Sequence, residues 1–378
     1  MGSESRNRYL LKNTLIFTLG NIGSRMISFF LIPLYTNVLT TSQYGTVDLI
    51  TTISTVAGPM LTLNIAESVM RFGLDKDADK EKNTQCGSIV LLIAMIIGLV
   101  LIPICRCITE VSDYAMYVYF YVISLSASQL FLCDLRGKEL LLKYSLGNIL
   151  QTLMIAILNI TFLLVFKMET GGYLLAYIIA NFIVAIYAII AGKGYKAFSF
   201  HNIDRCKLKE MIRYSVVLIP NTFMWWIMNS SDRVMVTYMI GAAANGIYAV
   251  SYKLPTLVST LTGIFNQAWS YSAIREEGTS DETEYNNKMF KTLSAIAFMM
   301  GIGLLLLTKP FLGVYVADSY YDAWKYTPFL IIGCVYLTLG TFMATSYTVH
   351  KDSFGYLFSG SFGAAFNIRL SLTVILVI

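Results

Sequence analysis

The stretch that decides the fold reads RYSVVLIPNTFMWWIMNSSDRVMVTYMIGAAANGIYAVSYKLP and covers residues 213–255. Residues 214–240 are apolar enough and numerous enough to cross a bilayer as one helix. This helix nevertheless contains Asp232 and Arg233 side by side. A charge at the centre of a membrane helix costs at least about 2.5–3.5 kcal/mol and is tolerated where it faces a wet cavity or a partner. The stretch therefore predicts a membrane helix with a functional polar face.

The polar face of this helix extends beyond the charged pair. Polar and aromatic side chains recur at i, i+4, i+8 and i+11/12, at Asn221, Trp225, Asn229 and the pair Asp232–Arg233. Pro220 is expected to interrupt the backbone hydrogen bonds near the start of the helix, as in the broken helices of transporters. The alternative interpretation is an Asp–Arg pair near the membrane surface that only fixes helix packing.

The composition of the whole chain agrees with a membrane protein. Hydrophobic residues make up 56% of the 378 positions and charged residues only 13%, against about 25% charged in soluble domains. Apolar runs recur throughout, which predicts a polytopic helical protein with eleven spans. Their bounds are 13–37, 44–70, 86–104, 114–135, 144–166, 172–192, 214–240, 246–272, 292–308, 326–348 and 354–378.

The basic residues set the expected orientation. With the N-terminus inside, the inside segments hold 20 Lys and Arg residues and the outside loops hold 4. This bias predicts a cytoplasmic N-terminus. The basic residues lie in turns between spans, so orientation explains the net charge of +5 and no nucleic-acid partner is implied.

Two bundles are expected along the chain. Residues 1–195 form the first, 196–213 a cytoplasmic linker, and 214–378 a second that is one span short and therefore expected to be truncated. Spans 1–2 and spans 7–8 are each joined by a short turn that ends in a glycine, Gly45 or Gly246. This weak repeat fits transporters built from two related halves.

Other spans carry polar residues at helical spacing. These are Asn21 and Arg25 in the first span, Glu67 and Arg71 at the end of the second, and Lys253 and Gln267 in the eighth. Two alternatives stay open. Arg71 could pair with Glu67 as an anchor at the inner surface, and Lys253 could extend to the outer interface.

The cations Arg25, Arg233 and Lys253 lie in the helix pairs that open the two bundles. If those pairs face each other, the cations line one cavity that attracts a phosphate-bearing or acidic substrate. The motifs G-x-x-x-x-G-K-[ST], H-E-x-x-H and G-x-S-x-G are absent from the sequence. The chain is therefore not expected to be an enzyme, and no cofactor and no metal site are predicted.

Several of these segments together resemble a known family. LKNTLIFTLGNIGSRMISFFLIPLYTNVLTTSQYG (11–45), ESVMRF (67–72), RYSVVLIP (213–220), the pair 232–233 and GAAANGIY (241–248) are similar to bacterial polysaccharide-biosynthesis exporters, the lipid-linked oligosaccharide flippases. These belong to the superfamily of multidrug, oligosaccharidyl-lipid and polysaccharide exporters. The resemblance implies an all-α fold of about eleven transmembrane helices here, in two six-helix-type bundles around a central cavity.

The resemblance also implies a function. It is the flipping of undecaprenyl-diphosphate-linked oligosaccharide, a repeat unit of O-antigen, capsule or exopolysaccharide, across the cytoplasmic (inner) membrane. H+ or Na+ would be the coupling ion, membrane lipids would surround the protein, and glycosyltransferases and a polymerase would share the pathway. The alternatives are a cation-coupled multidrug exporter of the same superfamily and an inactive truncated remnant.

Overall fold

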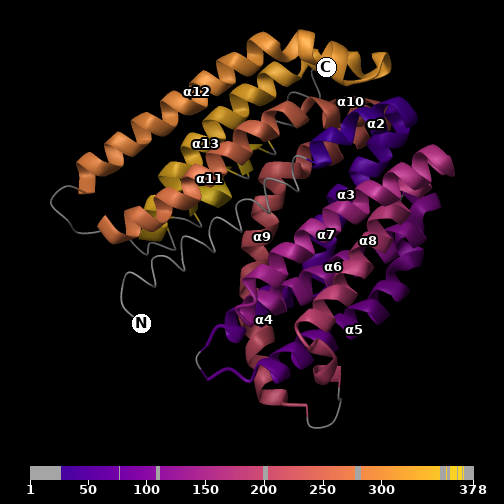
Figure 1. Ribbon diagram of the computed structural model, residues 1–378, viewed down its shortest axis with the longest axis vertical. Helices are drawn as coiled ribbons and strands as arrows, with labels where there is room; N and C mark the ends of the chain where they lie inside the picture. Colours follow the sequence, from indigo (N-terminus) through magenta and orange to yellow (C-terminus); the bar gives the residue numbers. More distant parts are fainter. Residues whose placement is uncertain are drawn as a thin grey trace. The chain divides into compact units, whose positions relative to one another are not determined.

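The computed structural model describes residues 27–75, 77–107, 111–198, 203–276, 282–349, 355, 358–363, 365–367 and 369. All regular structure within these residues is helical, so the predicted all-α class is confirmed (Figure 1). The elements in chain order are α2 (Ile32–Val38), α3 (Thr41–Leu61), α4 (Ile65–Gly73), α5 (Lys80–Arg106), η1 (Ser112–Tyr114), α6 (Ala115–Gly137), α7 (Leu141–Ile160), η2 (Thr161–Val165), α8 (Glu169–Ala191), η3 (Gly194–Phe198), α9 (Arg205–Met239), α10 (Ala242–Ser251), α11 (Lys253–Glu276), α12 (Glu282–Tyr315), η4 (Asp318–Lys325) and α13 (Thr327–Val349).

Six apolar helices in the described part of the chain are long enough to cross a membrane, or seven if the bent pair α3–α4 is one span. The six are α5, η1 with α6, α7 with η2, α8, α12 and α13, and they match six of the predicted spans. Helices α9 and α11 have 35 and 24 residues but carry more polar side chains, and they fall outside this apolar set. Much of the predicted spans 13–37 and 354–378 lies outside the described residues.

The predicted span 44–70 is not one straight helix. Helices α3 and α4 meet at an angle of 60°. Leu63 and Asn64 adopt positive φ angles of 53° and 54°, which end α3 and restart the chain in a new direction. The Asn64 N–H donates to the carbonyl of Pro59 at 2.6 Å, which closes the turn. The bend follows from these two residues, which periodicity does not identify.

Two prolines behave differently from each other. Pro220 lies inside α9, which continues from Arg205 to Met239, so the predicted broken helix is wrong there: the missing proline N–H removes one hydrogen bond without ending the helix. Near Pro255 the predicted span 246–272 divides into α10 and α11. Proline lacks an N–H and leaves the carbonyl four residues earlier without its helical donor. That carbonyl, on Ser251, accepts instead from the Thr327 hydroxyl of α13 at 3.2 Å.

The chain divides into two compact units. Unit 1 is Met1–Leu34 with Thr46–Trp226, and unit 2 is Tyr35–Gly45 with Ile227–Ile378. In unit 1, α6 packs against α4, α5 and α8, and α7 packs against α8. In unit 2, α11, α12 and α13 pack on one another, as the orange and yellow ribbons of Figure 1 show. The domain bounds 1–195 and 214–378 stay a prediction.

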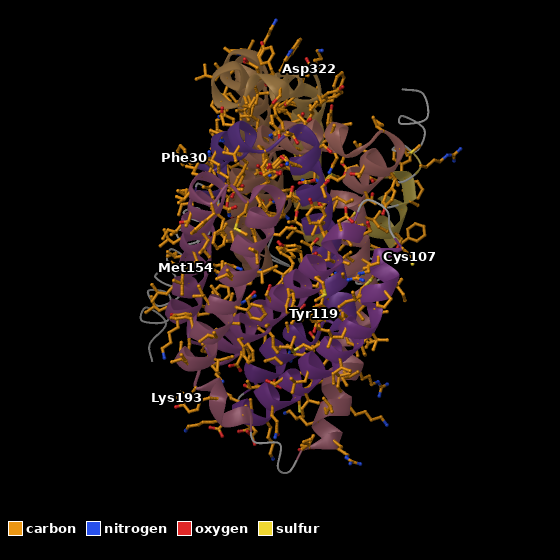
Figure 2. The ribbon with its side chains drawn as sticks, turned by 90° about the vertical axis from the view of Figure 1, so that its right-hand side faces the viewer. Phe30, Cys107, Tyr119, Met154, Lys193 and Asp322 are labelled. Carbon is orange, nitrogen blue, oxygen red and sulfur yellow. The ribbon has the colours of Figure 1, made fainter. Side chains whose placement is uncertain are left out.

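Helix α5 gives unit 1 two distinguishable ends. It has 27 residues and is about 40 Å long at 1.5 Å per residue. Lys196 of η3 approaches Glu81 at the start of α5, and Lys207 lies 5.5 Å over the Phe72 ring near the end of α4. Cys107 follows the other end of α5, and Figure 2 shows it away from Lys193. The exposed thiols of Cys107 and Cys206 therefore mark opposite ends of unit 1.

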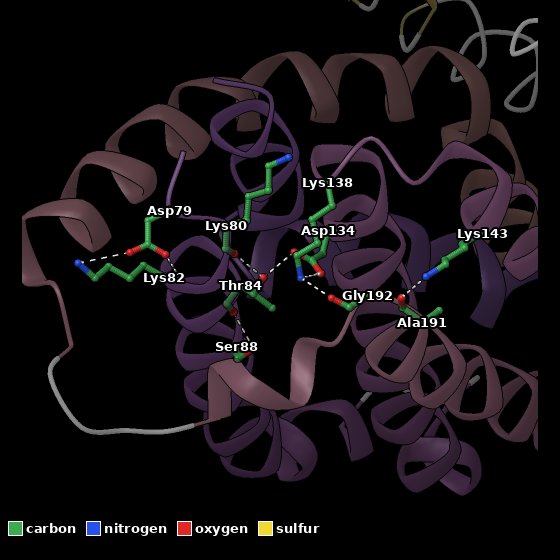
Figure 3. A network of polar contacts seen from close by, with 10 residues as sticks. All are labelled: Asp79, Lys80, Lys82, Thr84, Ser88, Asp134, Lys138, Lys143, Ala191 and Gly192. Atoms are coloured by element: carbon green, nitrogen blue, oxygen red, sulfur yellow. Dashed lines mark hydrogen bonds and ion pairs between the residues drawn. The ribbon is translucent and has the colours of Figure 1, made fainter. Parts of the chain in front are cut away.

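A buried ion pair joins three helices at the Lys193 end of unit 1 (Figure 3). The Lys138 ammonium donates to Asp134 Oδ2 at 2.6 Å and to the Gly192 carbonyl at 2.9 Å, and the two side chains are only 11% and 4% exposed. The Thr84 hydroxyl of α5 donates to Asp134 Oδ1 at 2.5 Å. Nearby, Lys143 donates to the Ala191 carbonyl at 2.8 Å. Two lysines thus complete the C-terminus of α8, where cations are favourable.

Two glycines meet in unit 2. They are Gly45 in the first turns of α3 and Gly246 in the first turns of α10. A Cβ on Gly45 would collide with the Ala242 carbonyl and stand 2.8 Å from Gly246 N, and a Cβ on Gly246 would collide with the Thr41 carbonyl. Across this crossing the Asn245 amide donates to the Gly45 carbonyl at 2.9 Å. The two turns noted as a sequence repeat therefore pack directly on each other.

Candidate functional site

Unit 1 contains a polar cavity of about 780 Å³. The bend between α3 and α4 forms one wall, and α6, α7 and α9 form the others. The lining residues are Pro59, Asn64, Ala66, Glu67, Leu125, Ser128, Gln129, Leu132, Cys133, Tyr144, Asn148, Gln151, Tyr214, Leu218, Asn221 and Thr222. Carboxamides and hydroxyls thus collect inside a unit whose helices are mainly apolar, and such sites in membrane helices are by default functional.

Some of these polar groups are held in place by hydrogen bonds to neighbouring side chains. The Asn64 amide donates to the Thr222 hydroxyl at 3.4 Å, so the bend of unit 1 is tied to α9. The Gln151 amide donates to Asn181 Oδ1 of α8 at 2.6 Å. These contacts orient the amide groups before any ligand arrives, which lowers the entropic cost of binding.

Glu67 has the one carboxylate among the described residues that line this cavity. Its side chain is half-buried, in the first turn of α4, and it makes no hydrogen bond or ion pair with any described residue. Arg71, one turn later, pairs instead with Asp75 at 2.6 Å, with both side chains about half exposed. Within the described residues, Glu67 therefore remains available to a ligand.

Asp232 and Arg233 lie in unit 2 and contact tyrosines. Asp232 Oδ2 accepts a short hydrogen bond from the Tyr248 hydroxyl of α10, and Oδ1 accepts from the Arg233 N–H at 3.0 Å. The Arg233 guanidinium lies 5.1 Å over the Tyr252 ring, a distance at which a cation is attracted to an aromatic face. These contacts join α9 to α10 and its C-cap.

The other predicted site residues are dispersed. Asn221 lines the cavity of unit 1 together with Glu67. Trp225 and Asn229 lie on α9, partly exposed, and Lys253 is the first residue of α11. Asn21 and Arg25, together with the side chain of Gln267, lie outside the described part of the structure. The substrate-binding roles of all these residues stay predictions.

Most of the residues that line the cavity are not among those predicted from the sequence. Tyr144, Asn148 and Gln151 recur at i, i+4 and i+7 on α7, and Gln129 and Cys133 at i and i+4 on α6. This spacing within two apolar runs was a usable signal of a polar helix face. Uncharged amides stand out less than charged residues in an apolar run, because burying them costs less.

The comparisons with known proteins agree on family and fold. A family model described as "Polysaccharide biosynthesis protein" matches residues 10–272. Comparison with curated protein sequences finds no significant match. Among solved structures, the chain is similar to an outward-facing multidrug resistance MATE family transporter of the MOP superfamily (14% identity, TM-score 0.60, 93% of this chain and 84% of that chain covered).

Two further structures show the same fold. One is the Vibrio cholerae MATE transporter VcmN (14% identity, TM-score 0.61, 95% and 87% covered). The other is a MOP superfamily transporter from Pyrococcus furiosus, whose binding pocket is described as reversed in polarity (13% identity, TM-score 0.52, 96% and 95% covered). Identities this low establish the fold alone, which is that of these transporters.

Proposed function

Because the chain belongs to the polysaccharide biosynthesis protein family, we propose that it flips an undecaprenyl-diphosphate-linked oligosaccharide across the cytoplasmic membrane. Family membership and a multi-pass transporter fold support a membrane exporter of the MOP superfamily. The proposal adds the lipid-linked sugar as substrate, H+ or Na+ as coupling ion, and glycosyltransferases and a polymerase as pathway partners.

The observation that carries the proposal is the polar cavity of unit 1. Its volume of about 780 Å³ lies within the roughly 300–1,000 Å³ of small-molecule sites. Carboxamides, hydroxyls and two tyrosine rings offer the hydrogen bonds and flat apolar faces that sugar rings require. The diphosphate would be held elsewhere, by the cations Arg233 and Lys253 of unit 2, since arginine contacts phosphate oxygens bidentately.

One observation favours a second candidate, export of lipophilic cations. Glu67, Tyr144 and Tyr214 line the same cavity, and a carboxylate beside aromatic rings attracts organic cations. The carboxamides weigh against this candidate, because a lipophilic cation does not satisfy their hydrogen bonds and burying unsatisfied polar groups is costly.

We expect loss of export when Asn148 and Gln151 are both replaced by leucine. The double change removes two amide groups from the cavity wall and should reduce export at least about tenfold, the effect of roughly 1.4 kcal/mol of lost hydrogen bonding. The readout is surface polysaccharide in a strain lacking its own flippase. Efflux of tetraphenylphosphonium, measured in parallel, reports the second candidate.

The control for this test is Glu81→Gln, an exposed change on α5 outside the cavity. It should export like the unaltered chain. Restoration of polysaccharide by the double leucine variant at the unaltered level would contradict a sugar-binding role. Efflux of the cation by a chain that does not restore polysaccharide would instead support the multidrug function.

The proposed orientation has a test that uses native thiols. Two variants, one retaining only Cys107 and one retaining only Cys206, compare exposed thiols at opposite ends of unit 1. With a cytoplasmic N-terminus, a membrane-impermeant maleimide added to intact cells should label Cys107 and leave Cys206 unlabelled. Permeabilised cells, in which both thiols should react, are the control. Labelling of Cys206 in intact cells would reverse the topology.

A further inference from the structure

The charge of the unit 1 cavity is opposite to that expected for a phosphate-binding site. Glu67 is acidic, and none of the described residues that line the cavity is Lys or Arg. Arg71 is engaged with Asp75 outside the lining. Arg136 lies 5.5 Å over the ring of Tyr144 and is not among the described lining residues. The described lining residues therefore carry one formal negative charge.

A carboxylate amid carboxamides favours a neutral, hydroxyl-rich ligand. Sugar hydroxyls donate to Glu67 through charge-assisted hydrogen bonds, which are about twice as strong as neutral ones. The amides of Gln129 and Asn148 can both donate and accept, as hydroxyls require. A second carboxylate on the ligand would face Glu67 in a partly desolvated site, where like-charge repulsion is strong.

We propose that the unit 1 cavity binds the saccharide part of the substrate and that Glu67 makes it selective for uncharged sugars over sugars with carboxylates. This rests on the proposed function for its physiological substrate, and it adds a specificity residue and a charge class. A cavity of this volume also exceeds what a single metal cation needs, so a sugar is the better match than a coupling ion.

The test measures binding to the purified full-length chain by titration calorimetry. The probes are maltotriose and the same trisaccharide with its terminal glucose oxidised to glucuronate. We expect maltotriose to bind about tenfold more tightly, since repulsion from Glu67 is partly offset by Arg136. Glu67→Gln should bring the two affinities within about twofold, by removing the charge while keeping the side-chain shape.

Glu81→Gln, an exposed carboxylate removed outside the cavity, should leave the tenfold ratio unchanged. Binding of neither trisaccharide, or a ratio unaffected by Glu67→Gln, would overturn the inference. A heat of Na+ binding in an NaCl titration that disappears in Glu67→Gln would also overturn the inference, because it would identify Glu67 as part of a cation site. If the chain does not export polysaccharide but still binds maltotriose about tenfold more tightly than the acidic trisaccharide, the proposed function is contradicted and this inference is not.

Discussion

Replacing Lys138 with alanine should destabilise unit 1 by about 3–5 kcal/mol, the usual effect of removing one partner from a buried ion pair. The Lys138 ammonium is the only cation that pairs with Asp134 among the described residues, and Asp134 is 4% exposed. Without it, the carboxylate keeps the Thr84 hydroxyl as hydrogen-bond donor. The Gly192 carbonyl loses its donor in the same change.

Lys82→Ala is the matched control. Lys82 and Asp79 form a second ion pair within one helix region, at a spacing of i, i+3 and a distance of 3.5 Å. Unlike Lys138 and Asp134, both of these side chains are about half exposed. Water and salt screen such pairs, which contribute about 0–1 kcal/mol. Thermal unfolding of the detergent-solubilised chain, followed by tryptophan fluorescence, should show a large loss of Tm for Lys138→Ala alone. Equal losses of Tm in the two variants would mean that water screens the Lys138–Asp134 pair as it screens the exposed one.

The sequence predicts the helices of this protein well and their direction changes poorly. Apolar runs locate α5, α6, α7, α8, α12 and α13, since only long helices satisfy the backbone in a bilayer. Hydropathy does not predict the bend at Leu63 and Asn64, because the bend depends on the backbone φ angles of these two residues. Pro220 was expected to break α9, yet the helix continues through it.

The cavity illustrates a second limit. Glu67 and Asn221 are predictable because a polar residue inside an apolar run is conspicuous. The amides of α6 and α7 are harder to assign, because a membrane helix is apolar on both its lipid-facing and its protein-facing sides. Periodicity then does not say which face turns inward. The exposed side chains of Ile96, Val100 and Ile104 on α5 show how apolar the outer surface is.

Replacing Gly45 with alanine should prevent unit 2 from folding normally, with an expected loss of about 3 kcal/mol, the upper part of the range for overpacking. The direction of this change in stability is informative, because alanine at an unhindered helix position is favoured over glycine by about 1 kcal/mol. Here the added Cβ would meet the Ala242 carbonyl oxygen and Gly246 N, which are backbone atoms. Neither can move away without separating α3 from α10.

The same crossing is fixed from several sides. The Asn245 amide holds the Gly45 carbonyl at 2.9 Å, and the Tyr320 hydroxyl, on a fully buried side chain, donates to the Leu39 carbonyl at 3.0 Å. A shift that accommodates the Cβ would stretch these bonds as well. Gly246→Ala should therefore resemble Gly45→Ala, because its Cβ meets the Thr41 carbonyl across the same contact.

Gly303→Ala on α12 is the control for both variants, since a Cβ at that position has nothing within 4 Å and should leave Tm unchanged or slightly raised. A second variant separates backbone collision from side-chain crowding. Ala242→Gly added to Gly45→Ala removes the neighbouring methyl group but keeps the carbonyl oxygen that the new Cβ meets. The double variant should therefore remain as unstable as Gly45→Ala. Recovery of the Tm would mean that side chains, and not backbones, set the distance between these two helices.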